Sequence, residues 1–208
     1  MSGRSQASLL LVLGATVLAV SAFSGMYANY VRPGFRPALV AAGAVLVLVA
    51  VLSFRREQRA PRVAWLLAVP VFAIVLVAPP ALGSYAARRG DAAPPPAADH
   101  RALGAGVTDL TLGDFIGRAT AGGSLAGRRV GLTGFVVRAR EGWYVARMRM
   151  ACCAADAFVL EVAVEGASAP PEDTWVRVTG TWAPGRQPAI RASEVRPVER
   201  PEEPYELL

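Results

Sequence analysis

The second half of the chain takes its fold from residues 128–153, RRVGLTGFVVRAREGWYVARMRMACC, in which apolar and polar side chains largely alternate. Such alternation is typical of β-strands with one covered face. Three later stretches repeat the pattern, and turn-forming residues such as Glu141-Gly142 and Pro184-Gly185 separate them. We therefore predict five strands, over residues 128–137, 142–153, 157–164, 174–182 and 189–197.

A short amphipathic helix is predicted just before these strands. Thr111-Leu112-Gly113-Asp114 resembles a capping box with Asp in place of Glu, and Phe115, Ile116 and Ala119 continue the apolar face at helical spacing. Five short strands with one helix suit a small OB-like β-barrel. An open antiparallel sheet packed on the helix is the structural alternative.

The first half of the chain is apolar, and three of its windows, residues 5–31, 37–54 and 63–87, contain no charged side chain. A helix that crosses about 30 Å of hydrocarbon needs roughly 20 apolar residues. We therefore expect transmembrane helices at about 7–26, 37–54 and 63–82. The first window also fits a signal peptide, but the two spans directly after it favour an uncleaved helix.

These patterns predict three parts. Residues 1–88 form a transmembrane region, residues 89–107 a Pro/Ala-rich linker, and residues 108–208 the folded domain. The expected fold class is an α+β membrane protein, with three N-terminal transmembrane helices followed by a small five-stranded OB-like β-barrel domain.

The charge distribution favours a membrane protein over a nucleic-acid binder. The net charge is +6, but residues 104–208 carry twelve arginines against thirteen acids, a net of −1. The basic excess therefore lies in the apolar half, as it does where arginines flank membrane spans. The densest group, between Arg55 and Arg62, is expected in the cytoplasm, which places the C-terminal domain outside it.

An enzymatic function is not expected. The single histidine, His100, lies in the predicted linker, where it can build neither a Ser/His/Asp triad nor a catalytic metal site of the usual type. The three apolar windows contain no ionisable residue that would mark an ion path. The sequence also lacks a phosphate-binding glycine loop.

The adjacent cysteines Cys152 and Cys153 end the second predicted strand. Successive side chains of a strand point to opposite faces, so Cys152 would share the face of Met148 and Met150. Cys153 would share the other face with two arginines, which mark the solvent side. In a regular strand we therefore expect Cys152 to be buried and Cys153 exposed.

Three interpretations of the cysteine pair stay open. The pair is a metal or redox site with Asp156, if the strand breaks or bulges there. It is a strained vicinal disulfide in an oxidising compartment. Or it is a buried packing cysteine beside an incidental one. Met148, Met150 and Cys152 also form a row of soft ligands that would suit monovalent copper.

Several blocks of the sequence carry a family resemblance: YVRPGFRP at 30–37, AAG at 41–43, RVAWLL at 62–67, APPALG at 78–83, CCAAD at 152–156, TWVRVTGTW at 174–182 and PYE at 204–206. Through these blocks the whole chain resembles the YcgQ-like family of bacterial permease-subunit membrane proteins. Relatives often carry a histidine-rich stretch between the second and third spans. Residues 55–61 of this chain contain no histidine, so metal binding is not expected in that loop.

The resemblance implies an accessory subunit of a multi-span permease, held as a multi-pass protein in the lipid bilayer of the bacterial cell membrane. Its extracytoplasmic domain would bind partner or substrate through Cys152, Cys153 and Asp156. The alternative is a metal- or redox-handling membrane protein in which the cysteine pair is the working site. No cofactor is expected other than a metal ion at the same three residues, and no nucleic acid is expected as a partner.

Overall fold

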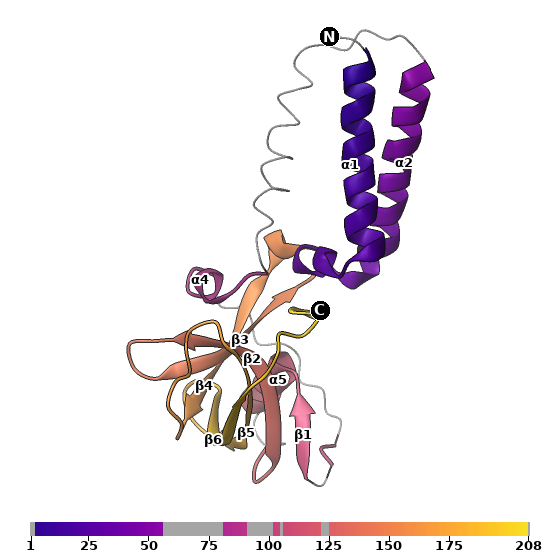
Figure 1. Ribbon diagram of the computed structural model, residues 1–208. Coiled ribbons are helices and arrows are strands. Elements are labelled where there is room, and N and C mark those ends of the chain that lie inside the picture. The colour runs from indigo at the N-terminus through magenta and orange to yellow at the C-terminus, as the bar shows by residue number, and fades with distance from the viewer. Residues whose placement is uncertain (1–2, 56–80, 91–101, 105, 122–124, 208) are drawn as a thin grey trace. The chain divides into compact units, whose positions relative to one another are not determined.

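The computed structural model describes residues 3–55, 81–90, 102–104, 106–121 and 125–207 (Figure 1). The chain divides into two compact units, Met1–Ala81 and Leu82–Leu208, and each is described by itself. Most of the predicted span at 63–82 lies outside the described residues, as do His100 and most of the predicted linker at 89–107.

In the first unit two helices pack side by side, α1 (Gly3–Phe23) and α2 (Arg36–Arg55) (Figure 1). The short 3-10 helices η1 (Met26–Asn29) and η2 (Pro33–Phe35) connect them. A Cβ atom added to Gly14 of α1 would lie 2.9 Å from the backbone nitrogen of Val47, so this glycine permits the close approach of the two helices.

The prediction of three transmembrane helices was wrong. Among the described residues one helix, Pro33–Arg55, is long and apolar enough to cross a membrane, and the apolar helix Ala7–Phe23 is shorter. The first apolar window does not continue as one helix, because α1 ends at Phe23 and the chain turns at Gly25 into η1. The apolar part of α1 that remains, Ala7–Phe23, falls short of the roughly 20 residues that a span needs.

The second unit is built on one mixed sheet and two helices, α4 (Ser84–Ala87) and α5 (Leu112–Ala121). The seven strands of the sheet are β1 (Val107–Leu110), β2 (Arg129–Arg138), β3 (Trp143–Met150), β4 (Phe158–Glu165), β5 (Trp175–Ala183), β6 (Ala189–Pro197) and β7 (Glu206–Leu207). The five strands that the alternating pattern predicts coincide closely with β2 to β6.

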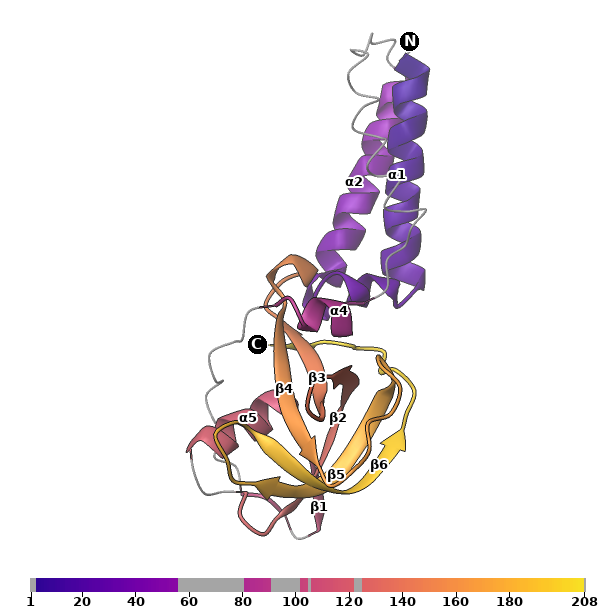
Figure 2. The ribbon, with the colours of Figure 1, turned by 90° about the vertical axis from the view of Figure 1, so that its left-hand side faces the viewer.

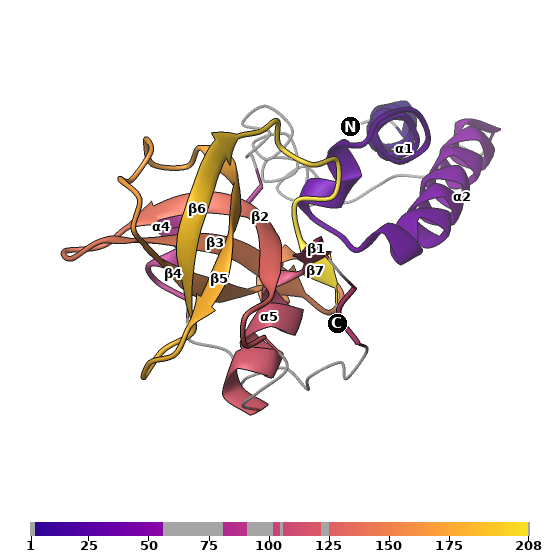
Figure 3. The same ribbon diagram turned by 90° about the horizontal axis from the view of Figure 1, so that it is seen from below.

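Strands β2 to β6 close on one another. β2 pairs antiparallel with both β3 and β5, β5 with β6, and β3 with β4, while β4 and β6 pair in parallel. Figure 2 and Figure 3 show these strands curving around a common interior. Gly134 of β2 lies where β2 turns toward β3, and a Cβ atom there would meet the Ala146 carbonyl oxygen at 2.4 Å.

The expected fold class is therefore corrected in the sheet as well as in the helices. The sheet has seven strands instead of five, because β1 adds in parallel to β2 and β7 adds in parallel to β3. Both extra strands are short, and both pair with strands distant from them in sequence. A run of two to four residues carries too little periodicity to predict a strand.

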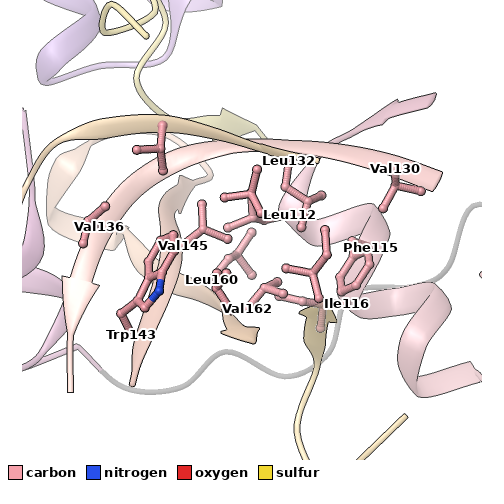
Figure 4. Packing of buried hydrophobic residues seen from close by; sticks show 14 of the residues in the cluster. Leu112, Phe115, Ile116, Val130, Leu132, Val136, Trp143, Val145, Leu160 and Val162 are labelled. Atoms are coloured by element: carbon pink, nitrogen blue, oxygen red, sulfur yellow. The ribbon is translucent and has the colours of Figure 1, made fainter. Parts of the chain in front are cut away.

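The core lies between α5 and the inward side chains of the strands. Figure 4 shows Phe115 and Ile116 of α5 gathered with residues of the strands such as Leu132 and Val162. Leu112, Phe115 and Leu132 are fully buried. The apolar face that the sequence predicts for this helix is thus the face that covers the sheet.

The two faces of β3 differ from the prediction. Trp143 and Val145 belong to the core cluster, so the face of β3 that includes the two arginines begins on the core side of the sheet. Met148 and Met150 are also buried, at 2% and 1% exposure, on the opposite face. Both faces of β3 thus carry buried side chains, and α4 contacts both β2 and β3.

The C-terminal segment accepts hydrogen bonds from the two arginines at the end of β3. Arg147 donates hydrogen bonds to the carbonyl oxygens of Glu203 at 2.6 Å and Pro204 at 3.3 Å. Arg149 donates to the carbonyl oxygen of Leu207 at 3.3 Å. Burial lowers the pKa of Arg147, and the negative charges of Glu206 and Glu203 partly oppose that shift.

Candidate metal centre

The regular strand geometry of β3 stops just before the cysteines. β3 ends at Met150, β4 begins at Phe158, and residues 151–157 between them are here called the cysteine loop. Residues Ala154–Asp156 form the 3-10 helix η3, with Cys153 as its N-cap in an extended conformation. The regular alternation of side chains therefore does not reach the cysteine pair.

The expected burial of the two cysteines is reversed by this break. Cys152 is exposed and Cys153 is half-buried, and both are free thiols. Met148 and Met150 stay buried in the strand, so the predicted row of soft ligands with Cys152 is not formed. The prediction was wrong because it continued the strand by three residues too many, to Cys153 instead of Met150.

Asp156 holds the loop together through its carboxylate. Oδ1 accepts a hydrogen bond from the amide of Ala151 at 3.0 Å, and Oδ2 accepts from the amides of Cys152 at 2.9 Å and Cys153 at 3.4 Å. In return, the Asp156 amide donates to the side chain of Cys153, which completes a capping box.

The same carboxylate also holds the thiol proton of Cys152. The Cys152 Sγ donates to Oδ2 at 2.7 Å, and this hydrogen bond lowers the pKa of Asp156 together with those from the backbone. The hydrogen bond to Asp156, with a smaller contribution from Cys153, raises the pKa of the Cys152 thiol to about 11. With its pKa raised in this way, the Cys152 thiol stays protonated at neutral pH and donates to the Asp156 carboxylate.

The three predicted site residues come together in the structure. The Sγ atoms of Cys152 and Cys153 are 3.7 Å apart, and the two sulfurs and a carboxylate oxygen of Asp156 all lie within 4.8 Å of one another. Two thiolates and one carboxylate are a ligand set that Zn²⁺ and similar ions accept. The described part of the chain therefore contains a candidate metal centre on an exposed loop.

A second carboxylate, missed by the sequence interpretation, lies beside the same end of β3. Glu206 of β7 is 6% exposed and accepts hydrogen bonds from the amides of Leu112 at 2.6 Å and Gly113 at 3.0 Å. β7 pairs with Arg149 and Met150, the last residues before the cysteine loop. The block PYE at 204–206 was the signal in the sequence, but nothing in it indicated a helix cap.

The comparisons with known proteins concern this second unit. Residues 120–206 match the DUF1980 C-terminal domain, whose family is uncharacterised. The chain matches no curated protein and no solved structure. The matched range includes β2 to β6 and the whole cysteine loop. The C-terminal part of this chain is thus similar to the DUF1980 C-terminal domain.

Proposed function

We propose that the protein is a membrane-anchored accessory subunit that binds a divalent metal ion of the zinc class at its cysteine loop. Cys152 and Cys153 would supply two thiolates and Asp156 a carboxylate oxygen. The observation that carries this proposal is the cluster of these three donor atoms within 4.8 Å of one another.

The distances favour a metal ion over a disulfide. Two thiolates on one tetrahedral Zn²⁺, each about 2.3 Å from the ion, stand about 3.8 Å apart. The sulfurs of Cys152 and Cys153 are 3.7 Å apart. A disulfide would require them to approach to about 2.05 Å, so the pair is closer to the geometry of a shared ion.

Asp156 needs only a small movement to become a ligand. A zinc-bound sulfur and carboxylate oxygen stand about 3.5 Å apart, given bond lengths of about 2.3 and 2.0 Å. The Sγ of Cys152 is now 2.7 Å from Oδ2, because the thiol proton lies between them. Binding of the ion would expel this proton, since a thiol that coordinates a metal is deprotonated.

The membrane part of the proposal rests on the first unit and on the family resemblance. Pro33–Arg55 is long and apolar enough to cross a membrane. We place the anchor in the bacterial cell membrane. The partner in this proposal is a multi-span permease, to which the loop would present its ion.

A redox function is the second candidate, because both thiols are free and adjacent. In that case an external disulfide would oxidise the pair, with two electrons and two protons passing from the thiols to the oxidant as the Sγ–Sγ bond forms. Adjacent residues force a strained disulfide, which is easily reduced again. Counting free thiols before and after treatment with oxidised glutathione separates this candidate from metal binding.

The test of metal binding uses the full chain, purified in detergent under reducing conditions and titrated with Co²⁺ as an optical probe for Zn²⁺. We expect thiolate-to-cobalt charge-transfer bands that saturate at one ion per chain and disappear when Zn²⁺ is added. Cys152→Ser, Cys153→Ser and Asp156→Asn should each weaken binding. The matched control is Glu194→Gln, which removes an exposed carboxylate on β6. Binding that the three loop variants leave unchanged would refute the proposal.

The permease partner has its own test. The full chain carries a tag at its C-terminus, native membranes are solubilised gently, and the proteins that co-purify are identified. A multi-span permease present in stoichiometric amount supports the accessory role. Recovery of the chain alone contradicts it and leaves metal binding as the whole of the proposed function.

A further inference from the structure

The candidate metal centre has three donors, one fewer than a closed zinc site. Structural zinc sites are closed by four protein ligands, whereas sites with three keep a position for water or another ligand. Within the described residues, the group contains Cys152, Cys153 and Asp156 and no fourth His, Cys, Asp or Glu. The chain has two cysteines in all, so a third thiolate cannot come from within it as the fourth ligand.

The surroundings of the three donors place the free side of the ion toward solvent. Cys152 and Asp156 are exposed. The amides of Ala151, Cys152 and Cys153 point at the Asp156 carboxylate, so the backbone of the loop occupies one side of the cluster. A further donor can therefore approach from outside the protein without displacing a packed side chain.

The charge of the site favours a neutral donor. Two thiolates and a carboxylate carry three negative charges, and a divalent ion leaves the site with a net charge of about −1. A further thiolate or carboxylate would add another negative charge at short range. A neutral imidazole nitrogen adds none, and it is a donor that zinc accepts readily.

We propose that the cysteine loop holds its ion with one position open, and that this position accepts the imidazole of a histidine from a partner protein. This inference rests on the proposed metal-binding function and deepens it. A site completed by its partner can pass the ion on, because the incoming imidazole binds before any of the three loop ligands leaves. The exposed loop would then act as a transfer site instead of a structural one.

The experiment uses the full chain in detergent, loaded with one equivalent of Co²⁺ and titrated with free imidazole. We expect the cobalt d–d bands to shift and to saturate at one imidazole per ion, with the charge-transfer bands retained because both thiolates stay bound. Sodium acetate, an anionic oxygen donor, is the control and should cause no shift over the same concentration range. A shift with acetate equal to that with imidazole would overturn the proposed preference.

Two further measurements make the outcome decisive. His100→Ala removes the one histidine of the chain, and the imidazole shift should be the same in this variant. A shift that appears only in His100→Ala would mean that His100 closes the site, and it would overturn the inference. One cobalt for every two chains, with dimers on light scattering, would mean that a second copy supplies the ligands and would overturn it too.

The failure of this inference differs from the failure of the proposed function. If cobalt does not bind at all, metal binding itself is refuted, and the transfer site falls with it. If cobalt binds through both thiolates but its spectrum does not respond to imidazole, the site is closed. In that case the transfer site is refuted and metal binding stands.

Discussion

The cysteine loop and the N-terminus of α5 are each held by one carboxylate, which is exposed in the loop and buried at the helix. In each, one carboxylate accepts hydrogen bonds from consecutive backbone amides: Asp156 in the loop and Glu206 at the helix. Glu206 is buried and is supplied by a distant strand, whereas Asp156 is exposed and lies within its own loop. The buried carboxylate caps α5, and the exposed one holds the backbone beside the two free thiols.

The largest expected effect is on metal affinity, and it should be confined to the loop. Cys152→Ser replaces a thiolate ligand with a weakly coordinating hydroxyl, and we expect the Kd for Zn²⁺ to rise by more than about 100-fold. Stability should change by less than about 0.5 kcal/mol, because the side chain is exposed. Competition with a chromophoric chelator measures the affinity, and urea unfolding measures the stability. A large loss of stability in Cys152→Ser would contradict the view that the cysteine loop serves metal binding while the buried Glu206 serves the stability of the fold.

Glu206→Ala should lower the stability of the fold and leave the metal affinity of the cysteine loop unchanged. It leaves the amides of Leu112 and Gly113 without their acceptor in a buried setting, which costs about 1–3 kcal/mol of unfolding free energy. Glu206→Gln keeps one acceptor oxygen and should cost less. Urea unfolding, followed by tryptophan fluorescence, to which the buried Trp143 contributes, gives the values. If Glu206→Ala unfolds like the wild type, the buried carboxylate is not the stabilising one.

Asp156→Asn tests whether the negative charge of Asp156 sets the pKa of the Cys152 thiol. The carboxylate accepts the Cys152 thiol proton and repels the thiolate, which holds the thiol pKa at about 11. The amide has no charge, so the pKa should fall toward the ordinary value for a thiol, about 8.5. At pH 9 to 10 the variant would therefore contain more Cys152 thiolate than the wild type.

The absorbance of the thiolate near 240 nm, followed against pH, measures this shift in Asp156→Asn. Cys153→Ser is the background in which to record it, so that a single thiol titrates. An unchanged or higher pKa in Asp156→Asn would mean that the hydrogen bond from Cys152 to Asp156 does not control the thiol.

The smallest effect is expected at the exposed half of the α5 cap. The Oγ1 of Thr111 accepts a hydrogen bond from the amide of Asp114 at 3.1 Å, as the predicted capping box requires. Thr111→Ala should lower the unfolding free energy by about 0.5–1 kcal/mol, which is less than the loss in Glu206→Ala. Thr111→Ser, which keeps the hydroxyl, is the control. The reverse order of the two losses would indicate that Thr111, and not Glu206, starts the helix.

Local patterns predicted the elements of the second unit well. The alternation that begins at Arg128 marks β2 to β6, and the capping box with Phe115 and Ile116 marks α5. The first unit was predicted less well, because the hydropathy of a window does not report where its helix ends. The turn at Gly25 shortens the first apolar helix although the residues after it, such as Met26 and Tyr27, are still uncharged.

The candidate site was also predicted only in part. The spacing Cys-Cys-x-x-Asp was visible as a donor set, and the sequence analysis named all three residues. Their exposure was predicted in reverse, because the strand was continued through the pair. The end of β3 at Met150 depends on its pairing with β4 and β7, and neither partner can be read from the residues of β3.

The sequence by itself determined which side chains share a strand or helix face, and which three donors lie close together along the chain. Only the tertiary structure decided that both faces of β3 are covered, that β7 carries Glu206 to the start of α5, and that Cys152 is exposed. The physical reason is that periodicity depends on backbone geometry within one segment, whereas burial and capping depend on the distant segment that packs against it.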